Sequence, residues 1–200
     1  MNTKVVQVGL GLLTLIGVVV AVIVFIPKTE SFRGTLYDPA LPAPEIELIQ
    51  GNGSNFRLSE KRGDVVLLFF GYTSCPDVCP TTLSEMKRVM AALGADAQRV
   101  QVVFVTVDPG RDTPEKLKEY VSIFNPAFIG LSGSMDELEK VWSEYGVYRE
   151  EEALPNSATG YLVNHTARVY LIDRDGNLRL SYSYGTPKDD FVHDLKILFE

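Results

Sequence analysis

Hydrophobic residues follow two alternating patterns along this chain. Predominantly apolar runs occupy residues 65–70, 100–107 and 127–131, and each run is short for a helix. Runs of this length that are rich in Val and Phe are typical of strands covered on both faces. After the first run, apolar residues recur at helical spacing, at Leu83, Met86, Val89, Met90 and Leu93. Strands that alternate with helices predict βαβ units and a parallel sheet.

Helix starts are marked by capping residues. Thr113 is followed by Pro114, an N-cap before a proline whose φ suits the first helical turn. Ser134 and Glu137 have the spacing of a capping box. The helix that they begin is predicted to place the single tryptophan, Trp142, in the core.

Two further segments have the pattern of antiparallel hairpins. Residues 45–49 and 55–58 flank a Gly-Asn-Gly turn, and residues 168–173 and 178–184 flank an Arg-Asp-Gly-Asn turn. Residues 150–160 are polar and acidic and are predicted to form a loop. The order of elements predicts an α/β fold: a thioredoxin-like mixed sheet with helices on both faces and an N-terminal hairpin.

The beginning of the chain differs from the rest. Residues 5–26 carry no charge and are numerous enough to cross a hydrocarbon layer of about 30 Å. A cleaved signal peptide is the alternative, but its apolar region is usually only about 7–15 residues long. We expect a single-pass transmembrane signal anchor at residues 1–28, a stalk at residues 29–44 and the thioredoxin-like domain at residues 45–200. The domain is expected on the extracytoplasmic face of the inner (cytoplasmic) membrane, where disulfides are permitted.

Charge argues against one class of partner. The chain has 19 Lys and Arg against 26 Asp and Glu, a formal net charge of −7, and no cluster of basic residues. Nucleic-acid binding depends on a basic surface, so nucleic acid is not expected as a partner. The acidic excess favours solubility and attraction of cations or basic surfaces.

The two cysteines, Cys75 and Cys79, stand between the run at residues 65–70 and the helical pattern that begins at Pro80. A helix N-terminus stabilises anions, so this position favours the thiolate, which attacks disulfides and binds soft metals. Three residues separate the cysteines, whereas thioredoxin-type redox motifs have two. Within a first helical turn they would share one face, about 6 Å apart along the axis. A metal site, a redox pair and a buried structural pair remain open, and metal binding is favoured.

A soft metal held by two thiolates needs at least one more donor, and the chain has two histidines. His193 lies in the last predicted helix, away from the apolar stripe that includes Phe191, and is expected on the surface. His165 directly precedes the strand predicted at residues 168–173. In a thioredoxin-like sheet the loop into that strand faces the first βα junction, so His165 is the expected third ligand.

Three motifs give the chain a recognisable signature. They are Phe69-Phe-Gly-Tyr-Thr-Ser-Cys-Pro-Asp-Val-Cys-Pro80, Val107-Asp-Pro-Gly-Arg-Asp-Thr-Pro114, and Tyr161-Leu-Val-Asn-His-Thr166 followed by Tyr170-Leu-Ile-Asp173. In this order, over about residues 35–199, they resemble the SCO/SenC family. Its members are membrane-tethered, thioredoxin-like copper proteins that serve cytochrome c oxidase assembly. The resemblance implies copper, as Cu(I) or Cu(II), bound by Cys75, Cys79 and His165, and it places Asp108 beside the metal site or facing a partner.

The resemblance and the donor set favour a copper metallochaperone that delivers copper to the CuA site of cytochrome c oxidase subunit II. The sequence does not identify the protein that loads it. Three ligands leave one coordination position open for transfer, whereas structural zinc sites usually have four protein ligands. A metal-transfer role is therefore expected rather than a purely structural site.

Two enzymatic alternatives remain. One is a thiol–disulfide oxidoreductase that reduces the cysteines of the oxidase's copper site. Thioredoxin-type enzymes place a cis-proline opposite the cysteine pair, and no proline lies between Pro155 and Pro187 to take that position. The other is a peroxidase or redox sensor that uses Thr81, Thr82 and Arg111.

Overall fold

The computed structural model of the chain describes residues 31–154 and 160–199. The compact unit of the described residues begins at Phe32. The predicted anchor and the start of the predicted stalk lie outside the described residues. Among the helices that are described, none is long and apolar enough to span a bilayer.

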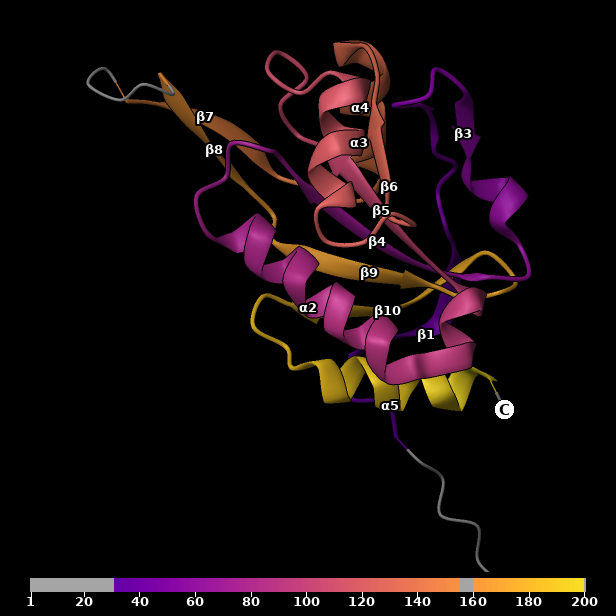
Figure 1. Cartoon of the computed structure of the whole chain (residues 1–200). Coiled ribbons are helices and arrows are strands. Elements are labelled where there is room, and N and C mark those ends of the chain that lie inside the picture. Colours follow the sequence, from indigo (N-terminus) through magenta and orange to yellow (C-terminus); the bar gives the residue numbers. More distant parts are fainter. Residues whose placement is uncertain (1–30, 155–159, 200) are drawn as a thin grey trace, which may run out of the picture. The chain divides into compact units, whose positions relative to one another are not determined.

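Within the described residues, eight strands form one mixed sheet in the order β1-β10-β9-β4-β5-β6-β2-β3 (Figure 1). The strands are β1 (Thr35–Pro42), β2 (Glu47–Gln50), β3 (Asn55–Arg57), β4 (Val65–Gly71), β5 (Val100–Thr106), β6 (Ile129–Ser132), β9 (Arg168–Ile172) and β10 (Asn177–Ser183). β4, β5 and β6 are parallel neighbours, and the other pairs are antiparallel. The predicted parallel core and the β2–β3 hairpin are confirmed.

The register of β4 and β5 brings their carboxyl ends together. The pairing runs from Val65 opposite Val100 to Gly71 opposite Thr106, so the loops that follow both strands leave the same edge of the sheet. The first of these loops carries the cysteines, and the second carries the Asp-Pro-Gly-Arg-Asp motif. Two motifs that are about thirty residues apart in the sequence are therefore neighbours.

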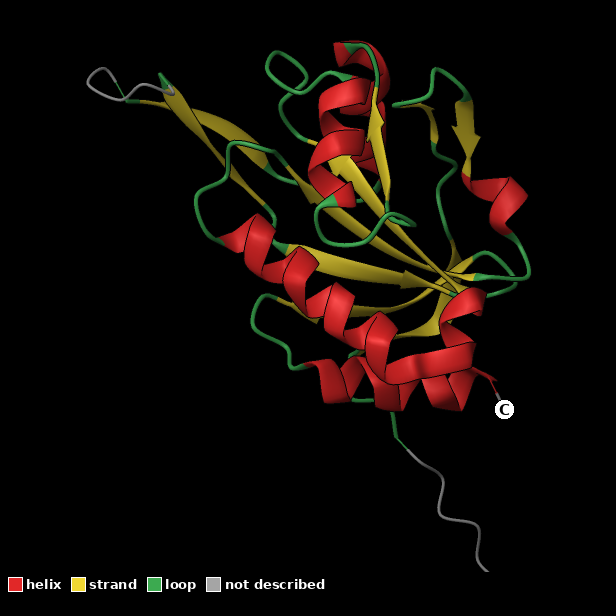
Figure 2. Cartoon of the chain, in the orientation of Figure 1, coloured by secondary structure: helices red, strands yellow, loops and turns green. Residues whose placement is uncertain are grey.

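Helices cover both faces of the sheet, as predicted (Figure 2). They are α2 (Val78–Leu93), α3 (Pro114–Ser122), α4 (Met135–Glu144) and α5 (Lys188–Phe199), with short 3₁₀ segments η1 (Leu58–Lys61) and η2 (Gly94–Arg99). Successive strand residues point to opposite faces. Phe69 lines a cavity together with Met86 of α2 and Phe191 of α5, whereas the ring of Phe70 lies 5.6 Å from that of Tyr145, at the end of α4. Every residue of β4 is buried because both faces are covered.

The predicted caps and the predicted core tryptophan are confirmed. Thr113 accepts a hydrogen bond from the backbone N–H of Lys116 at the start of α3. Ser134 and Glu137 form both hydrogen bonds of the capping box that begins α4. Trp142 is buried, and its indole N–H donates to the carbonyl of Thr106 at the end of β5.

Two segments differ from the sequence-based expectation. Residues 35–42, expected in an extended stalk, are extended but form β1, which pairs with β10 at the edge of the sheet. The predicted loop at residues 150–160 is wrong for its first part, because β7 (Arg149–Ala153) pairs with β8 (Tyr161–His165). These strands form a separate two-stranded sheet, here called the β7–β8 arm, which projects from the main sheet (Figure 1). A run of three glutamates has no strand pattern of its own, and these residues form a strand only because they pair with β8.

Candidate metal centre

The two cysteines occupy different positions at the start of α2. Cys79 lies in the first helical turn and is buried, but Cys75 precedes the helix and is half-buried. The arrangement of both cysteines within one helical turn, considered from the sequence, is therefore not the one observed. The N-cap residue Asp77 makes no side-chain cap, and the backbone N–H of Cys79 donates to the sulfur of Cys75 at 3.4 Å. Both cysteines are free.

This geometry makes Cys75 the thiolate of the pair. The thiol of Cys79 donates to the Cys75 sulfur, and this is the largest cause that lowers the pKa of Cys75 to about 4. The backbone N–H groups of Cys79 and Asp77 lower it further, whereas burial raises it. The pKa of Cys79 is raised, first by its hydrogen bond to Cys75 and then by burial. The pair therefore retains one proton, on the inner sulfur.

His165 ends β8 and faces the cysteines, as the sequence predicted. Its Nε2 lies 3.7 Å from the sulfur of Cys79. Its Nδ1 lies 3.1 Å from the carbonyl oxygen of Thr166, which can only accept a hydrogen bond, so Nδ1 carries the proton. This arrangement leaves the lone pair of Nε2 directed to the sulfur side and resembles the outer hydrogen bond of metal-binding histidines. The rings of Phe69 and Tyr72 lie edge-on to the imidazole, at 6.4 and 5.9 Å, and fix its plane.

The spacing between sulfur and imidazole suits a bound metal ion. Bonds of about 2.3 Å to sulfur and about 2.0–2.1 Å to nitrogen, at tetrahedral to trigonal angles, place two ligands of one ion about 3.5–3.8 Å apart. The observed 3.7 Å between Cys79 and His165 falls in that range. As the described residues are placed, no group of three or more His, Cys, Asp or Glu side chains could hold a metal ion. The structure therefore places Cys79 and His165 at the spacing of two ligands, with the sulfur of Cys75 beside the backbone N–H of Cys79.

Asp108 lies in the loop after β5 and is buried, with 1% of its surface exposed. Its carboxylate pairs with the guanidinium of Arg111 and accepts a hydrogen bond from the hydroxyl of Tyr161 at 2.8 Å. Its backbone N–H donates to the hydroxyl of Thr106. The carboxylate therefore contacts the start of β8, four residues from His165, and the role of Asp108 beside a metal or towards a partner stays a prediction.

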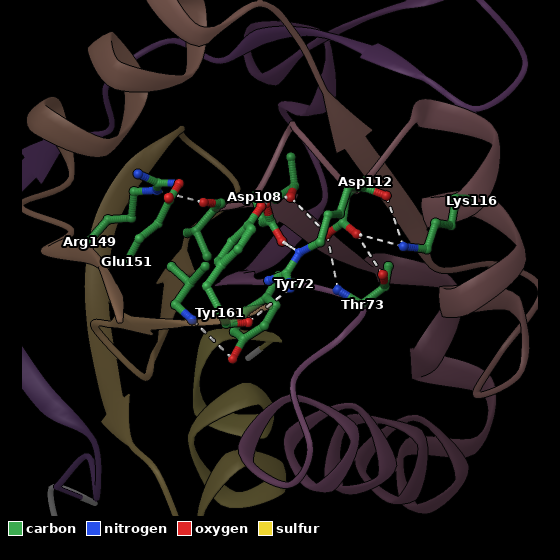
Figure 3. A network of polar contacts seen from close by, with 12 residues as sticks. Tyr72, Thr73, Asp108, Asp112, Lys116, Arg149, Glu151 and Tyr161 are labelled. Carbon is green, nitrogen blue, oxygen red and sulfur yellow. Dashed lines mark hydrogen bonds and ion pairs between the residues drawn. The ribbon is translucent and has the colours of Figure 1, made fainter. Parts of the chain in front are cut away.

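Asp112 is a further buried residue of the site that the sequence analysis did not single out (Figure 3). Its carboxylate accepts hydrogen bonds from the backbone N–H and hydroxyl of Thr73 and from the hydroxyl of Thr106. The ammonium of Lys116 lies 3.4 Å away. Asp112 therefore fixes the first turn of the cysteine loop. The sequence did contain a signal for Asp112, because it is a polar residue shortly after a buried parallel strand. The carboxyl ends of β4 and β5 meet at one edge of the sheet, so such a residue can reach the cysteine loop.

The remaining candidates have other partners. The hydroxyls of Thr81 and Thr82 donate to the side chain of Asp77 and to the carbonyl of Val78, both on their own helix turn. His193, predicted on the surface, is half-buried beside the carboxylate of Asp194 at 2.9 Å. None of these contacts reaches the cysteines.

The fold and the site together define a class of protein. A thioredoxin-like domain carries a thiolate and a thiol at its first βα junction, with an imidazole from another segment against the inner sulfur. That combination is characteristic of a thioredoxin-like protein with a soft metal or redox site.

The chain belongs to the SCO1/SenC family, whose sequence profile matches residues 37–200. It is 41% identical to apo Sco1 of Thermus thermophilus, with a TM-score of 0.76, over 86% of this chain and 99% of that one. It is 40% identical to copper-bound ScoI of Bradyrhizobium japonicum, with a TM-score of 0.70, over 78% and 98%. It is 25% identical to BsSco, described as having a disulfide switch and as a member of the Sco family of cytochrome c oxidase assembly proteins, with a TM-score of 0.62 over 80% and 94%.

Proposed function

We propose that this chain is a copper-binding protein that carries copper for the assembly of cytochrome c oxidase, with Cys75, Cys79 and His165 as its ligands. The observation that carries the proposal is the 3.7 Å spacing between the Cys79 sulfur and the Nε2 of His165, beside a Cys75 held as thiolate. Thiolates and imidazole form a soft donor set that suits Cu(I), and the same donors accept Cu(II) with a further ligand. Ligation by all three requires these donors to move closer together than the described residues place them.

The proposed transfer to an acceptor rests on the number of protein ligands and on the expected membrane anchor. Three protein ligands leave a position at which an incoming thiolate or imidazole binds before an old ligand leaves. The acceptor that fits this chemistry is the CuA centre of oxidase subunit II. Residues 5–26 would anchor the domain in the inner membrane, on the extracytoplasmic face. Support for the oxidase as target comes from the family that includes BsSco.

Copper binding by ligand variants tests the proposal. The purified full chain is reduced, titrated with Cu(I), and its stoichiometry is measured together with the absorption and EPR spectra of the Cu(II) form. We expect one copper per chain, and a large loss of affinity in Cys75→Ala, Cys79→Ala and His165→Ala. His193→Ala is the matched control, because His193 contacts Asp194 and not the cysteines. This variant should bind copper like the unaltered chain. Copper affinity unchanged by His165→Ala would refute the ligand set.

A thiol–disulfide oxidoreductase is the second candidate, and one observation favours it. The lowered pKa of Cys75, about 4, provides a thiolate that attacks disulfides and leaves readily from a mixed disulfide. Against it, no proline lies between Pro155 and Pro187 to serve as the cis-proline of a thioredoxin-type enzyme, and His165 lies against Cys79 instead. Disulfide-exchange assays separate the two roles: turnover that persists without copper and in His165→Ala would favour the enzyme.

A further inference from the structure

We infer that Arg111 is a positioning residue for the copper site: with Asp108, Tyr161 and Tyr72 it holds the β7–β8 arm so that His165 meets the cysteines. This set of four residues is called the Arg111 cluster below. The inference rests on the proposed function, because it assigns the residues that place the third ligand.

The main sheet does not by itself fix the position of His165. Among the described residues, β8 pairs with β7 alone and has no strand partner in the eight-stranded sheet. His165 is tied to the sheet on one side by the short connection to β9, which begins at Arg168. On the other side, β7 follows α4 in the chain, and Arg149 of β7 donates to the carbonyl of Val107. The described contacts that tie β8 itself to Tyr72 and to the loop after β5 are made by side chains. The strand ladder that usually fixes the register of a residue is therefore absent between His165 and β4 in the described residues.

Arg111 joins the loop after β5 to the start of β8. Its Nε pairs with the carboxylate of Asp108, and its Nη1 donates to the backbone carbonyl of Tyr161 at 2.9 Å. The guanidinium also lies over the ring of Tyr161, with 3.6 Å between its carbon and the ring centroid. The Tyr161 hydroxyl donates to the same carboxylate, which closes a ring of contacts (Figure 3). Burial of Asp108 and most of Arg111 strengthens these charged hydrogen bonds.

Tyr72 continues the connection from the arm to the sulfurs. Its hydroxyl accepts a hydrogen bond from the backbone N–H of Val163, in the middle of β8. Its ring lies 5.7 Å from the Arg111 guanidinium and 5.9 Å, edge-on, from the imidazole of His165. Its carbonyl accepts a hydrogen bond from the backbone N–H of Cys75. One residue therefore contacts the strand that carries the imidazole and the loop that carries the thiolate.

The test uses Cu(I) affinity, measured by competition with a colorimetric chelator, on the full chain. Arg111→Met retains the length of the side chain and removes its donors and charge. Its affinity should fall about 10- to 100-fold, the usual cost of losing an outer partner of a metal ligand. The control is Arg174→Met, since Arg174 also donates its Nε to a backbone carbonyl, that of Gly63, but at the opposite end of β4 and β9. That control should bind Cu(I) like the unaltered chain.

A double-mutant cycle distinguishes positioning from general stability. If Arg111 acts through His165, the variant with both Arg111→Met and His165→Ala should bind no more weakly than His165→Ala alone. If the two substitutions lower the Cu(I) affinity independently, so that their fold-changes multiply in the double variant, the inference is overturned. An unchanged affinity of Arg111→Met would also overturn it, and either result would leave the proposed function standing. An unchanged affinity of His165→Ala would instead refute the ligand set.

A readout without copper keeps the inference testable in every case. Tyr72→Phe removes only the hydroxyl that accepts from Val163. Amide hydrogen exchange at Val163 should be faster in Tyr72→Phe and in Arg111→Met than in Arg174→Met, with the exchange of β4 unchanged. Equal protection of Val163 in the three variants would show that the Arg111 cluster does not hold the arm, whichever residues bind copper.

Discussion

The sulfur of Cys79 and the Nε2 of His165 lie 3.7 Å apart, although 86 positions separate the two residues in the chain. Cys79 belongs to the first turn of α2, and His165 ends a strand outside the main sheet. Their proximity is a property of the tertiary structure, because two loops and the β7–β8 arm converge at one edge of the sheet. The proposed copper site depends on this convergence.

Alkylation of the copper-free, reduced chain should show the lowered pKa of Cys75. With a pKa of about 4, Cys75 is already a thiolate at pH 6, so its rate with iodoacetamide should be flat from pH 6 to 8 and fall as the pH drops towards 4. A cysteine of ordinary pKa, about 8.5, would react roughly 80-fold faster at pH 8 than at pH 6. Mass spectrometry of peptides identifies the alkylated residue.

The Cys79→Ala variant is the control for this prediction. It removes the thiol that is the largest cause of the lowered pKa of Cys75, so the alkylation rate should then rise with pH over the same interval. A tenfold or greater rise between pH 6 and 8 in the unaltered chain would contradict the assignment of the thiolate to Cys75.

Gly71→Ala should disturb the inner sulfur directly. A Cβ at Gly71 would lie 2.8 Å from the Cys79 sulfur and 2.7 Å from the ring of Phe104, closer than carbon contacts normally allow. We expect a loss of about 1–3 kcal/mol in the free energy of unfolding, measured in urea, and weaker copper binding. Gly110→Ala is the matched control, because its added Cβ would have nothing nearer than 3.7 Å. Equal stability of the two variants would count against this packing.

Asp112→Ala should destabilise the fold through the cysteine loop. The substitution leaves the backbone N–H of Thr73 and the hydroxyl of Thr106 without their buried acceptor. Each unsatisfied group costs about 1–3 kcal/mol, so the free energy of unfolding should fall by about 3 kcal/mol. Asp175→Ala, at an exposed turn, should change it by less than about 0.5 kcal/mol. Urea unfolding with matched m-values provides the comparison, and a similar midpoint for both variants would refute the role of Asp112.

Asp194→Ala should release the segment that precedes β1. The buried carboxylate accepts hydrogen bonds from the backbone N–H groups of Arg33 and Gly34 and from the hydroxyl of Tyr182. Its removal should lower the free energy of unfolding by about 3 kcal/mol and speed amide exchange at Gly34. Asp190→Ala removes only the partly exposed ion pair with Arg33, which should contribute about 0–1 kcal/mol. Unchanged exchange at Gly34 in Asp194→Ala would contradict the prediction.

Local sequence patterns were sufficient for the core elements. The apolar run that became β4, the N-cap of Thr113 and the capping box of Ser134 act over a few residues, so their signal is complete within the sequence. The strands β7 and β1 gave no such signal. β7 contains three glutamates in succession and β1 two prolines, and each is a strand only because β8 or β10 lies beside it.

Residue type and spacing alone were enough to predict the βαβ core and the cysteine pair at the first βα junction. His165 was predicted as the third donor from the expected topology and from the family motifs. Three features became visible only in the folded chain: which sulfur is the thiolate, the burial of the Asp108 carboxylate against Arg111, and the contacts of Tyr72 and Arg111 with the strand of His165. These relationships depend on distances between segments far apart in the chain. No local pattern contains those distances, because they arise only when the loops after β4 and β5 and the β7–β8 arm pack together.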